Sequence, residues 1–195
     1  MTTVLGPIVR LQVQRNPLKR GEKPNRRYTP DDILPVQRAL IDADGMVGWA
    51  EDREVIDVHN RRHPETRNND GRNSLSVGFT AHYRAIIERY GEHVTPGCAG
   101  ENILVEIDRM ISLDEVARGF VILSHTRTPL AELVDVTVAH PCKPFSGFVH
   151  RHETVAPETL KATLQFLDDG MRGFYCSTTS RNPVAISVGD WVAVS

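Results

Sequence analysis

The sequence has few cysteines, no long apolar run and no excess of basic residues, and each absence excludes a class of protein. Three cysteines, Cys98, Cys142 and Cys176, cannot all pair, and their spacing matches neither a zinc knuckle nor a disulfide framework. We therefore expect reduced thiols, one of them with a chemical role. No window approaches the roughly 18 consecutive apolar residues of a membrane helix. Segment 1–15 lacks the basic start and apolar core of a signal peptide, so we expect a cytoplasmic protein with no membrane partner.

The charge balance argues against a nucleic-acid partner. With 23 Lys and Arg against 25 Asp and Glu, the formal charge is −2, so no large basic field is available to hold a phosphate backbone. The 195 residues are enough for one full hydrophobic core and short for two. We expect a single domain over residues 1–195 that acts on a small-molecule substrate.

Glycine and proline recur at short intervals along the chain, and this spacing predicts a mainly β fold. The 14 Gly and 12 Pro separate short apolar stretches rich in Val and Ile, which is typical of strands. Many short strands in one modest domain favour a barrel or a sandwich. Strands are predicted over 6–14, 34–42, 54–58, 74–77, 101–106, 120–124, 130–140, 184–187 and 190–194. Amphipathic segments 80–90 and 157–167 are predicted to be helices packed on the outside of the sheet.

Two polar segments are predicted to be loops. Segment 15–31 combines several basic residues with three prolines, which favours an extended surface loop, and segment 61–72 is a second polar loop. His59 and His63 stand four residues apart, as metal ligands do on a helix, but Pro64 directly after them opposes a helix. We expect both histidines to be surface groups or to support a site from behind, without a metal role.

Cys142 is the first candidate for chemistry. Pro141 and Pro144 stiffen the backbone around it, and His140 and Lys143 favour the thiolate. A thiolate suits a soft metal or sulfur transfer. The alternative is a buried structural cysteine.

The turn at 96–102 is the second candidate. Gly97 and Gly100 permit a positive φ and close backbone approach, so successive amides can cradle an anion. Glu101 and Asn102 then present polar groups where a strand begins. The alternative is a tight turn in which these two side chains only satisfy backbone donors.

Segment 170–176 is the third candidate. Arg172 lies between Gly170 and Gly173 and directly before an apolar segment, where it can reach a phosphate with two parallel hydrogen bonds. Gly189 and Asp190 are predicted to form only the turn before the last strand.

In this order, Pro96 to Ile103, His140-Pro141-Cys142, and Gly170 to Tyr175 leading to Gly189-Asp190 resemble the MOSC family, named after the C-terminal domain of molybdenum cofactor sulfurases. The resemblance spans about residues 35–194. It implies a single, mainly β domain related to the pyruvate kinase β-barrel, with peripheral helices. Some members reduce N-hydroxylated bases or amidoximes, and others are linked to sulfur delivery to the molybdenum cofactor.

The resemblance also implies site residues. It makes Cys142 the molybdenum ligand or sulfur carrier, and it makes a set of turn residues the wall of the molybdopterin pocket: Gly100, Glu101, Asn102, Arg172 and Gly173. Such a cofactor needs a cation for its phosphate, open amides and one soft ligand. Lys23, Arg26 or Arg27 can add a second phosphate contact. Many bacterial members have a Gly-Asp-x-His-like element that this chain lacks after Gly48, and His59 or His63 takes the place of that histidine.

Three functions remain open. The leading hypothesis is an oxidoreductase that reduces N-hydroxylated substrates with electrons from a separate reductase, because the chain has no flavin, iron–sulfur or dinucleotide fingerprint. The second is sulfur transfer through a Cys142 persulfide supplied by a cysteine desulfurase. The third is a carrier that only binds the cofactor, which is labile enough to be absent from purified protein. A zinc site on His140 and Cys142 is a weaker fourth.

Overall fold

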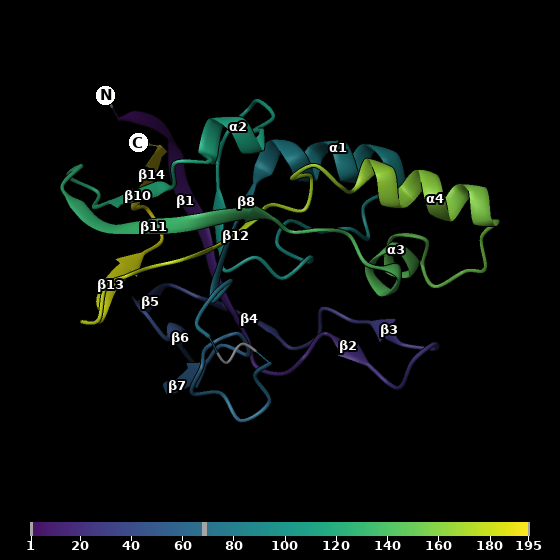
Figure 1. The fold of residues 1–195 in the computed structure, drawn as a ribbon, viewed down its shortest axis with the longest axis horizontal. Helices are drawn as coiled ribbons and strands as arrows, with labels where there is room; N and C mark the ends of the chain where they lie inside the picture. The colour runs from purple at the N-terminus through teal and green to yellow at the C-terminus, as the bar shows by residue number, and fades with distance from the viewer. Residues whose placement is uncertain (1, 68–69, 195) are drawn as a thin grey trace.

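The computed structural model of the chain describes residues 2–67 and 70–194, and strands dominate it (Figure 1). The strands are β1 (Thr3–Gln14), β2 (Lys19–Arg20), β3 (Arg27–Tyr28), β4 (Ile33–Val36), β5 (Arg38–Asp42), β6 (Gly45–Ala50), β7 (Arg53–Ile56), β8 (Leu75–Phe79), β9 (Ile103–Val105), β10 (Phe120–Leu123), β11 (Pro129–Val138), β12 (Phe174–Ser177), β13 (Val184–Ser187) and β14 (Trp191–Val194). The helices are α1 (Thr80–Tyr90), α2 (Leu113–Val116), α3 (Lys143–Val149) and α4 (Pro157–Phe166).

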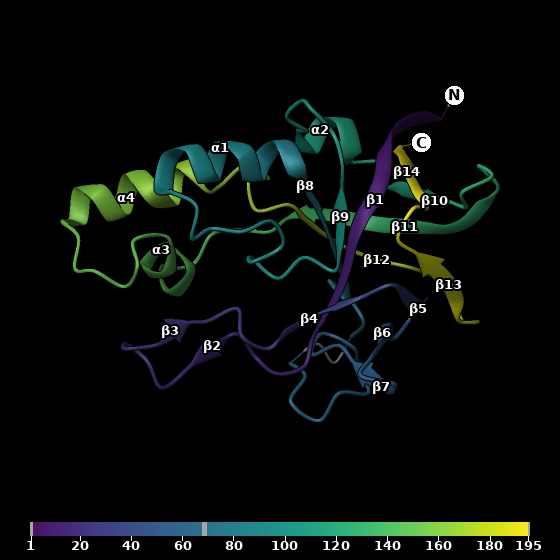
Figure 2. The ribbon, with the colours of Figure 1, turned by 180° about the vertical axis from the view of Figure 1, so that it is seen from behind.

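Seven strands close into a barrel. They follow the order β14-β10-β11-β12-β8-β9-β1, and β1 pairs again with β14, so that Thr3 lies opposite Val194. Figure 2 shows β1 running past both β14 and β9. All pairs in the barrel are antiparallel except β8 with β9. The predicted mainly β barrel with peripheral helices is confirmed.

A second, four-stranded sheet of order β13-β5-β6-β7 lies below the barrel in Figure 1. The single strand predicted over 34–42 is wrong, because the chain changes partner at Gln37. Before this residue β4 pairs with β1, and after it β5 pairs with β6 and β13. Pro35 has no N–H to donate, which suits β4 to its place at the sheet edge. Strand β6 was not predicted, because Gly45 and Gly48 interrupt its apolar pattern.

The predicted helices 80–90 and 157–167 are confirmed as α1 and α4, both outside the barrel (Figure 2). Helix α3 was not predicted, and it lies between α4 and the β2–β3 hairpin in Figure 1. Segment 15–31, predicted to be an extended surface loop, contains this hairpin and buries Tyr28. Within the described ranges, no helix has the length and apolar character needed to cross a bilayer.

Two apolar clusters hold these elements together. The first fills the barrel and includes Val77, Phe79 and Phe174. The second packs α1 and α3 against the hairpin and includes Tyr28, Tyr83, Ile86, Phe145 and Leu167. Burying a large apolar side chain contributes about 1.5–3 kcal/mol, so each cluster can fix the segments that cross it. The three candidate segments lie at the border between the two clusters.

Candidate functional site

Arg172 joins the three segments that the sequence singled out. Its Nη1 donates to the carbonyl oxygen of His140 at 3.1 Å, and its Nη2 donates to the carbonyl oxygen of Ala99 at 3.3 Å. The guanidinium carbon lies 4.3 Å from the centre of the Phe145 ring, within cation–π range. One side chain therefore brings together the 96–102 turn, the end of β11 and the turn before β12.

The guanidinium of Arg172 is buried and only partly hydrogen-bonded. The residue is only 6% exposed, and among the described residues its buried Nε has no hydrogen-bond partner. Burial opposes the charge, but interactions with Tyr28, Tyr175 and Cys142 raise the pKa of Arg172, so that it stays a cation. Because buried donors are nearly always satisfied, an open donor on a buried cation is a feature of a ligand site.

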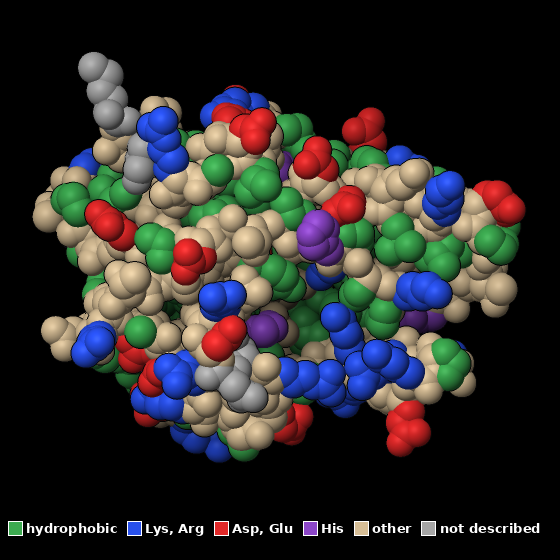
Figure 3. Space-filling model, viewed as in Figure 1, with side chains coloured by type: hydrophobic (Ala, Val, Ile, Leu, Met, Phe, Trp, Pro, Cys, Tyr) green, Lys and Arg blue, Asp and Glu red, His purple; other side chains and the backbone are tan. Residues whose placement is uncertain are grey.

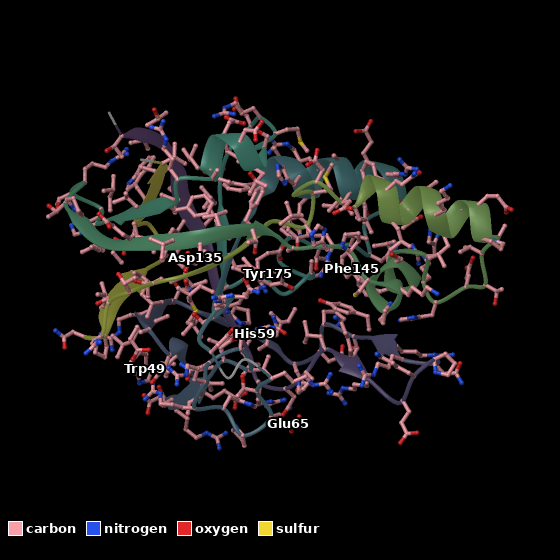
Figure 4. All side chains as sticks on the ribbon, in the orientation of Figure 1. Trp49, His59, Glu65, Asp135, Phe145 and Tyr175 are labelled. Atoms are coloured by element: carbon pink, nitrogen blue, oxygen red, sulfur yellow. The ribbon has the colours of Figure 1, made fainter. Side chains whose placement is uncertain are left out.

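A cavity of about 190 Å³ opens beside Arg172. Figure 3 shows the hollow near the middle of the molecule, and Figure 4 shows Tyr175 on its upper side and His59 on its lower side. Ligand pockets usually measure roughly 300–1,000 Å³, so this cavity encloses one part of a ligand of that size. The lining residues are Gln14, Pro17, Leu18, Lys19, Arg26, Tyr28, Val58, His59, Glu65, Arg67, Ser76, Ala99, Gly100, Glu101, Ala139, Arg172 and Tyr175.

Glu101 is a buried acid in the cavity wall. Its carboxylate accepts a 2.6 Å hydrogen bond from the Tyr83 hydroxyl, which itself accepts one from the Ala99 N–H at 2.9 Å. Burial raises the pKa of Glu101, and the Tyr83 hydrogen bond and the nearby Arg172 offset only part of that rise. The carboxyl therefore holds its proton more tightly than an ordinary glutamate, as groups that give up a proton in catalysis do.

Asn102 does not line the cavity. Its Nδ2 donates to the Asp57 carboxylate at 2.9 Å and to the Gln12 carbonyl oxygen at 3.3 Å, and its Oδ1 accepts from the Ser76 hydroxyl at 3.0 Å. The whole amide is used inside the protein. Asn102 therefore anchors the turn to β1 and β8, through side-chain groups and a carbonyl oxygen rather than through the backbone donors considered for it.

The two predicted glycines have different places. Gly100 lines the cavity with φ of +96°, and its carbonyl oxygen accepts a 2.6 Å hydrogen bond from Gln14 Nε2. Gly173 lies behind the wall with φ of +81°, and a Cβ there would clash with the Val77 carbonyl oxygen of β8. Of the predicted pocket wall, Gly100, Glu101 and Arg172 face the cavity, and Asn102 and Gly173 support it.

Cys142 is partly buried and ends the segment before α3, where its carbonyl oxygen accepts the Ser146 N–H at 3.0 Å. It is not among the cavity-lining residues. The thiol does interact electrostatically with Arg172 and Tyr28, which both line the cavity, so it lies at the edge of the site. The neighbouring His140 turns its ring away to Asp168, at 2.9 Å.

The zinc alternative lacks a full set of protein ligands among the described residues. Over residues 2–67 and 70–194, no three His, Cys, Asp or Glu side chains gather as ligands. Structural zinc needs four protein ligands and catalytic zinc three. The zinc alternative named two ligands, His140 and Cys142, and the His140 ring is paired with Asp168.

Of the two histidines that the sequence left open, His59 is the one at the cavity. It lines the cavity, and its Nδ1 lies 3.1 Å from the carboxylate of the fully buried Asp57. The same carboxylate accepts the backbone N–H groups of His59 at 2.9 Å and of Gln14 at 2.7 Å. A carboxylate held in this way fixes the orientation of the imidazole. An Asp-x-His pattern that spans the end of the predicted strand 54–58 was the available signal.

A larger hollow, of about 680 Å³, lies elsewhere. It is lined by side chains of α1, α4 and the segment after α3, among them Tyr90, His150 and Glu158. None of the residues predicted for the site lines it. The smaller cavity beside Arg172 is therefore the candidate functional site.

Comparison with known protein families identifies the family of this chain. The family model described as MOSC domain matches residues 68–193, about two thirds of the chain. The chain belongs to the MOSC family. No curated protein matches its sequence.

Solved structures agree with this MOSC assignment at the level of the fold. The YuaD protein from Bacillus subtilis superposes with a TM-score of 0.60 at 16% identity, covering 99% of this chain and 95% of that one. YiiM from Geobacillus stearothermophilus gives a TM-score of 0.53 at 18% identity, covering 97% and 75%. At such identities the likeness shows the fold alone.

The matched MOSC region supplies only one side of the cavity. It contains Glu101, Cys142 and Arg172, but His59, Lys19 and Arg26 precede it. The second wall therefore comes from the N-terminal part of this chain.

Proposed function

We propose that this MOSC protein binds the molybdenum cofactor and reduces N-hydroxylated substrates, with Cys142 as the metal ligand. The observation that carries the proposal is the buried cation Arg172, which lines a cavity with a cysteine at its edge and whose Nε has no hydrogen-bond partner among the described residues. The MOSC family is associated with this cofactor. A buried cation with an unused donor is what the phosphate of such a cofactor needs.

The described residues fit the cofactor in kind. Arg172 offers a cation, and Cys142 offers one soft sulfur ligand. The open amides predicted for the turn are not found, because the N–H groups of Cys98, Ala99, Gly100 and Asn102 are all hydrogen-bonded within the protein. A single protein thiol is consistent with the lack of a ligand cluster among the described residues, because the pterin brings its own sulfur atoms. When bound, the cofactor supplies a molybdenum centre that can exchange electrons with a substrate.

Side chains around the cavity can supply the protons that the reduction consumes. Reduction of a hydroxylamine group to an amine consumes two electrons and two protons and releases water. His59, oriented by Asp57, and Glu101, with its raised pKa, are the groups placed to hold and deliver these protons. Electrons would come from a separate reductase, since the sequence carries no motif for an electron-transfer cofactor of its own.

Replacing Cys142 by Ser tests whether Cys142 is the molybdenum ligand. We expect the variant, made in a host that synthesises the cofactor, to contain roughly tenfold less molybdenum than the wild type, or even less. Loss of a group that only supports a metal ligand already lowers metal affinity by roughly tenfold or more. Metal content by elemental analysis and pterin by fluorescence are the measurements. The control is Cys176→Ala, which removes a thiol from the barrel interior. Unchanged molybdenum in Cys142→Ser would remove the ligand assignment.

Sulfur transfer is the second candidate, favoured by the partial exposure of Cys142 outside the cavity. In this reaction the Cys142 thiolate takes the outer sulfur of a desulfurase persulfide and releases the desulfurase thiol. Incubation with a cysteine desulfurase and cysteine should then leave cyanide-labile sulfur on Cys142 and none on Cys142→Ser. Turnover of N-hydroxylated substrates by protein without this sulfur would favour the reductase instead.

A further inference from the structure

The β2–β3 hairpin has an excess of positive charge that the rest of the chain does not share. Residues 19–28 contain five Lys and Arg and one Glu, which leaves 18 of the 23 Lys and Arg and 24 of the 25 Asp and Glu for all other positions. Figure 3 shows Lys and Arg side chains gathered over the hairpin, at the lower right of the molecule. An otherwise acidic chain therefore has one markedly basic surface.

The acids closest to the hairpin offset only part of this charge. Asp32 is buried and pairs with both Arg15 and Arg20, the first at 3.3 Å, so one carboxylate faces two cations. Glu22 and Asp31 are exposed, and they stand against four further basic residues of the hairpin: Lys19, Lys23, Arg26 and Arg27. The hairpin surface therefore keeps a net positive charge.

Buried side chains fix this surface relative to the candidate site. Leu18 and Tyr28, at the two ends of the hairpin, are only 5% and 2% exposed. The Tyr28 hydroxyl donates to the Cys98 carbonyl oxygen at 2.8 Å, and the Tyr28 ring meets the Phe145 ring edge-on with centroids 5.0 Å apart. Cys142 packs against the same apolar cluster. The basic surface is therefore tied to the segment that carries the proposed metal ligand.

The hairpin has an inner side and an outer side. Lys19 and Arg26 line the cavity, whereas Lys23 and Arg27 do not line it and are exposed. Of the three residues that the sequence offered for a second phosphate contact, only Arg26 is placed for it. The outer cations Lys23 and Arg27 lie beside the cavity, where a protein that docks on the hairpin would contact them.

We propose that the outer surface of the hairpin is the docking surface for the electron donor, and that this donor is a small acidic protein with a flavin or iron–sulfur group. The inference rests on the proposed reductase function and adds the partner to it. Electron-transfer proteins associate through small interfaces, and opposite charges steer such encounters.

The electrons balance with either kind of donor. Reduction of one hydroxylamine group to an amine and water takes two electrons and two protons. A reduced flavin protein that gives up two electrons docks once in each turnover, and a one-electron iron–sulfur protein docks twice. The donor is oxidised, and the two protons come from the side chains of the cavity.

An acidic protein fits this surface better than a nucleic acid or a membrane does. Both of these are extended polyanions, and they would also meet the remainder of the chain, in which 24 Asp and Glu outnumber 18 Lys and Arg. A small protein can dock on the hairpin alone. It would then lie next to the cavity in which the electrons are used.

Binding of an acidic plant-type ferredoxin and of an acidic flavodoxin to the full chain tests the surface by calorimetry at low ionic strength. We expect the double variant Lys23→Glu/Arg27→Glu to bind at least one of them about tenfold more weakly than the wild type does, because two attractive charges become repulsive. Arg118→Glu/Arg181→Glu is the matched control. It makes the same change in net charge on exposed residues next to α2 and β13, away from the hairpin in Figures 1 and 2.

The dependence on salt is a second measurement, which needs no variant. Wild-type affinity should fall steeply between roughly 20 and 300 mM NaCl, because screening weakens contacts between exposed charges. No binding of either protein, binding that is independent of salt, or an equal loss in both double variants would overturn the proposal. Binding of phosphatidylserine vesicles or of a short DNA duplex through Lys23 and Arg27, without binding of either acidic protein, would assign the surface to a membrane or a nucleic acid instead.

Kinetics of the cofactor-loaded protein separate this inference from the proposed function. With N-hydroxyadenine as substrate, reduced methyl viologen is a small donor that needs no docking surface. Lys23→Glu/Arg27→Glu should keep wild-type turnover with the viologen and lose about tenfold in kcat/KM for the protein donor. An unchanged kcat/KM for the protein donor would refute the docking surface and leave the reductase standing. Binding that depends on the hairpin, without turnover with any donor, would refute the reductase and leave the docking surface standing.

Discussion

At the scale of residues, Arg172 is the connection between segments far apart in the sequence. It binds carbonyl groups of Ala99 and His140, lies on the Phe145 ring and lines the cavity. The charge is tolerated in this buried place because the carbonyl groups of Ala99 and His140 accept its hydrogen bonds, and because interactions with Tyr28, Tyr175 and Cys142 favour the cation. The site therefore depends on the shape of the guanidinium as well as on its charge.

Replacing Arg172 by Lys should show this dependence. Lysine keeps the charge but cannot reach both carbonyl groups and cover the ring, so a loss of about 1–3 kcal/mol in the free energy of unfolding is expected from the unsatisfied groups. Urea denaturation measures it, with Arg118→Lys on the exposed surface as the control. Equal stability of the two variants would contradict the role of Arg172 as a connector.

At the scale of elements, α3 and β12 place the chemistry. Helix α3 begins directly after Cys142, with Pro144 in its first turn, where a missing N–H is harmless. It buries Phe145 and Val149 in the second apolar cluster. This packing fixes the segment that carries Cys142, whose thiol interacts electrostatically with Arg172. Strand β12 begins at Phe174, and its close approach to β8 sets the position from which Arg172 extends.

Gly173→Ala tests the approach of β12 to β8. A methyl group would meet the Val77 carbonyl oxygen in a backbone conformation with positive φ, so a loss of roughly 2–5 kcal/mol is expected. Gly147→Ala is the control, because it lies within α3 with only ordinary contacts. Thermal and urea denaturation measure both. A Gly173→Ala variant as stable as Gly147→Ala would show that this contact is not tight in solution.

At the scale of the whole molecule, the barrel closes by pairing its first and last strands, β1 and β14. The cavity lies where the barrel meets the second apolar cluster, which joins the hairpin to the helices. His82 lies on the barrel side of α1. Its Nδ1–H donates to the Gly170 carbonyl oxygen at 2.9 Å and its Nε2 accepts the Ile111 N–H at 2.9 Å, so a neutral ring connects three parts of the fold.

His82 gives the fold a predictable pH dependence. Burial lowers the pKa of His82 below its usual 6.5, only partly offset by its hydrogen bonds. Below pH 6.5 the unfolded chain binds a proton that the folded chain does not, so this contribution to stability is full above pH 6.5 and is lost as the pH falls toward the folded pKa. The loss is at most about 1.4 kcal/mol per pH unit.

Urea denaturation at pH 7.5, 6.5 and 5.5 measures this loss. Gln can donate to Gly170 and accept from Ile111 without titrating, so His82→Gln is expected to show a shallower decline of stability over this range. His125→Gln, on the turn between β10 and β11, is the exposed control. The same decline in His82→Gln as in the wild type would rule out His82 as its source.

The sequence predicted helices and strands correctly where the residues within the element itself determine its secondary structure. The apolar spacing of 80–90 and 157–167 predicted α1 and α4, and the Val- and Ile-rich runs predicted most barrel strands. The pattern failed at Gln37, where the chain leaves one sheet for another, and at 143–149, where no helix was predicted and α3 forms. Both outcomes depend on partners far along the chain.

The sequence by itself determined a mainly β MOSC chain whose ordered motifs include one cysteine and one glycine-flanked arginine. Only the tertiary structure decided that Arg172 connects these motifs, that Glu101 faces a cavity and Asn102 does not, and that His59 completes the opposite wall. The physical reason is that strand periodicity and turn chemistry are local, whereas burial, hydrogen-bond partners and cavity walls arise from contacts between segments that meet only when the barrel closes.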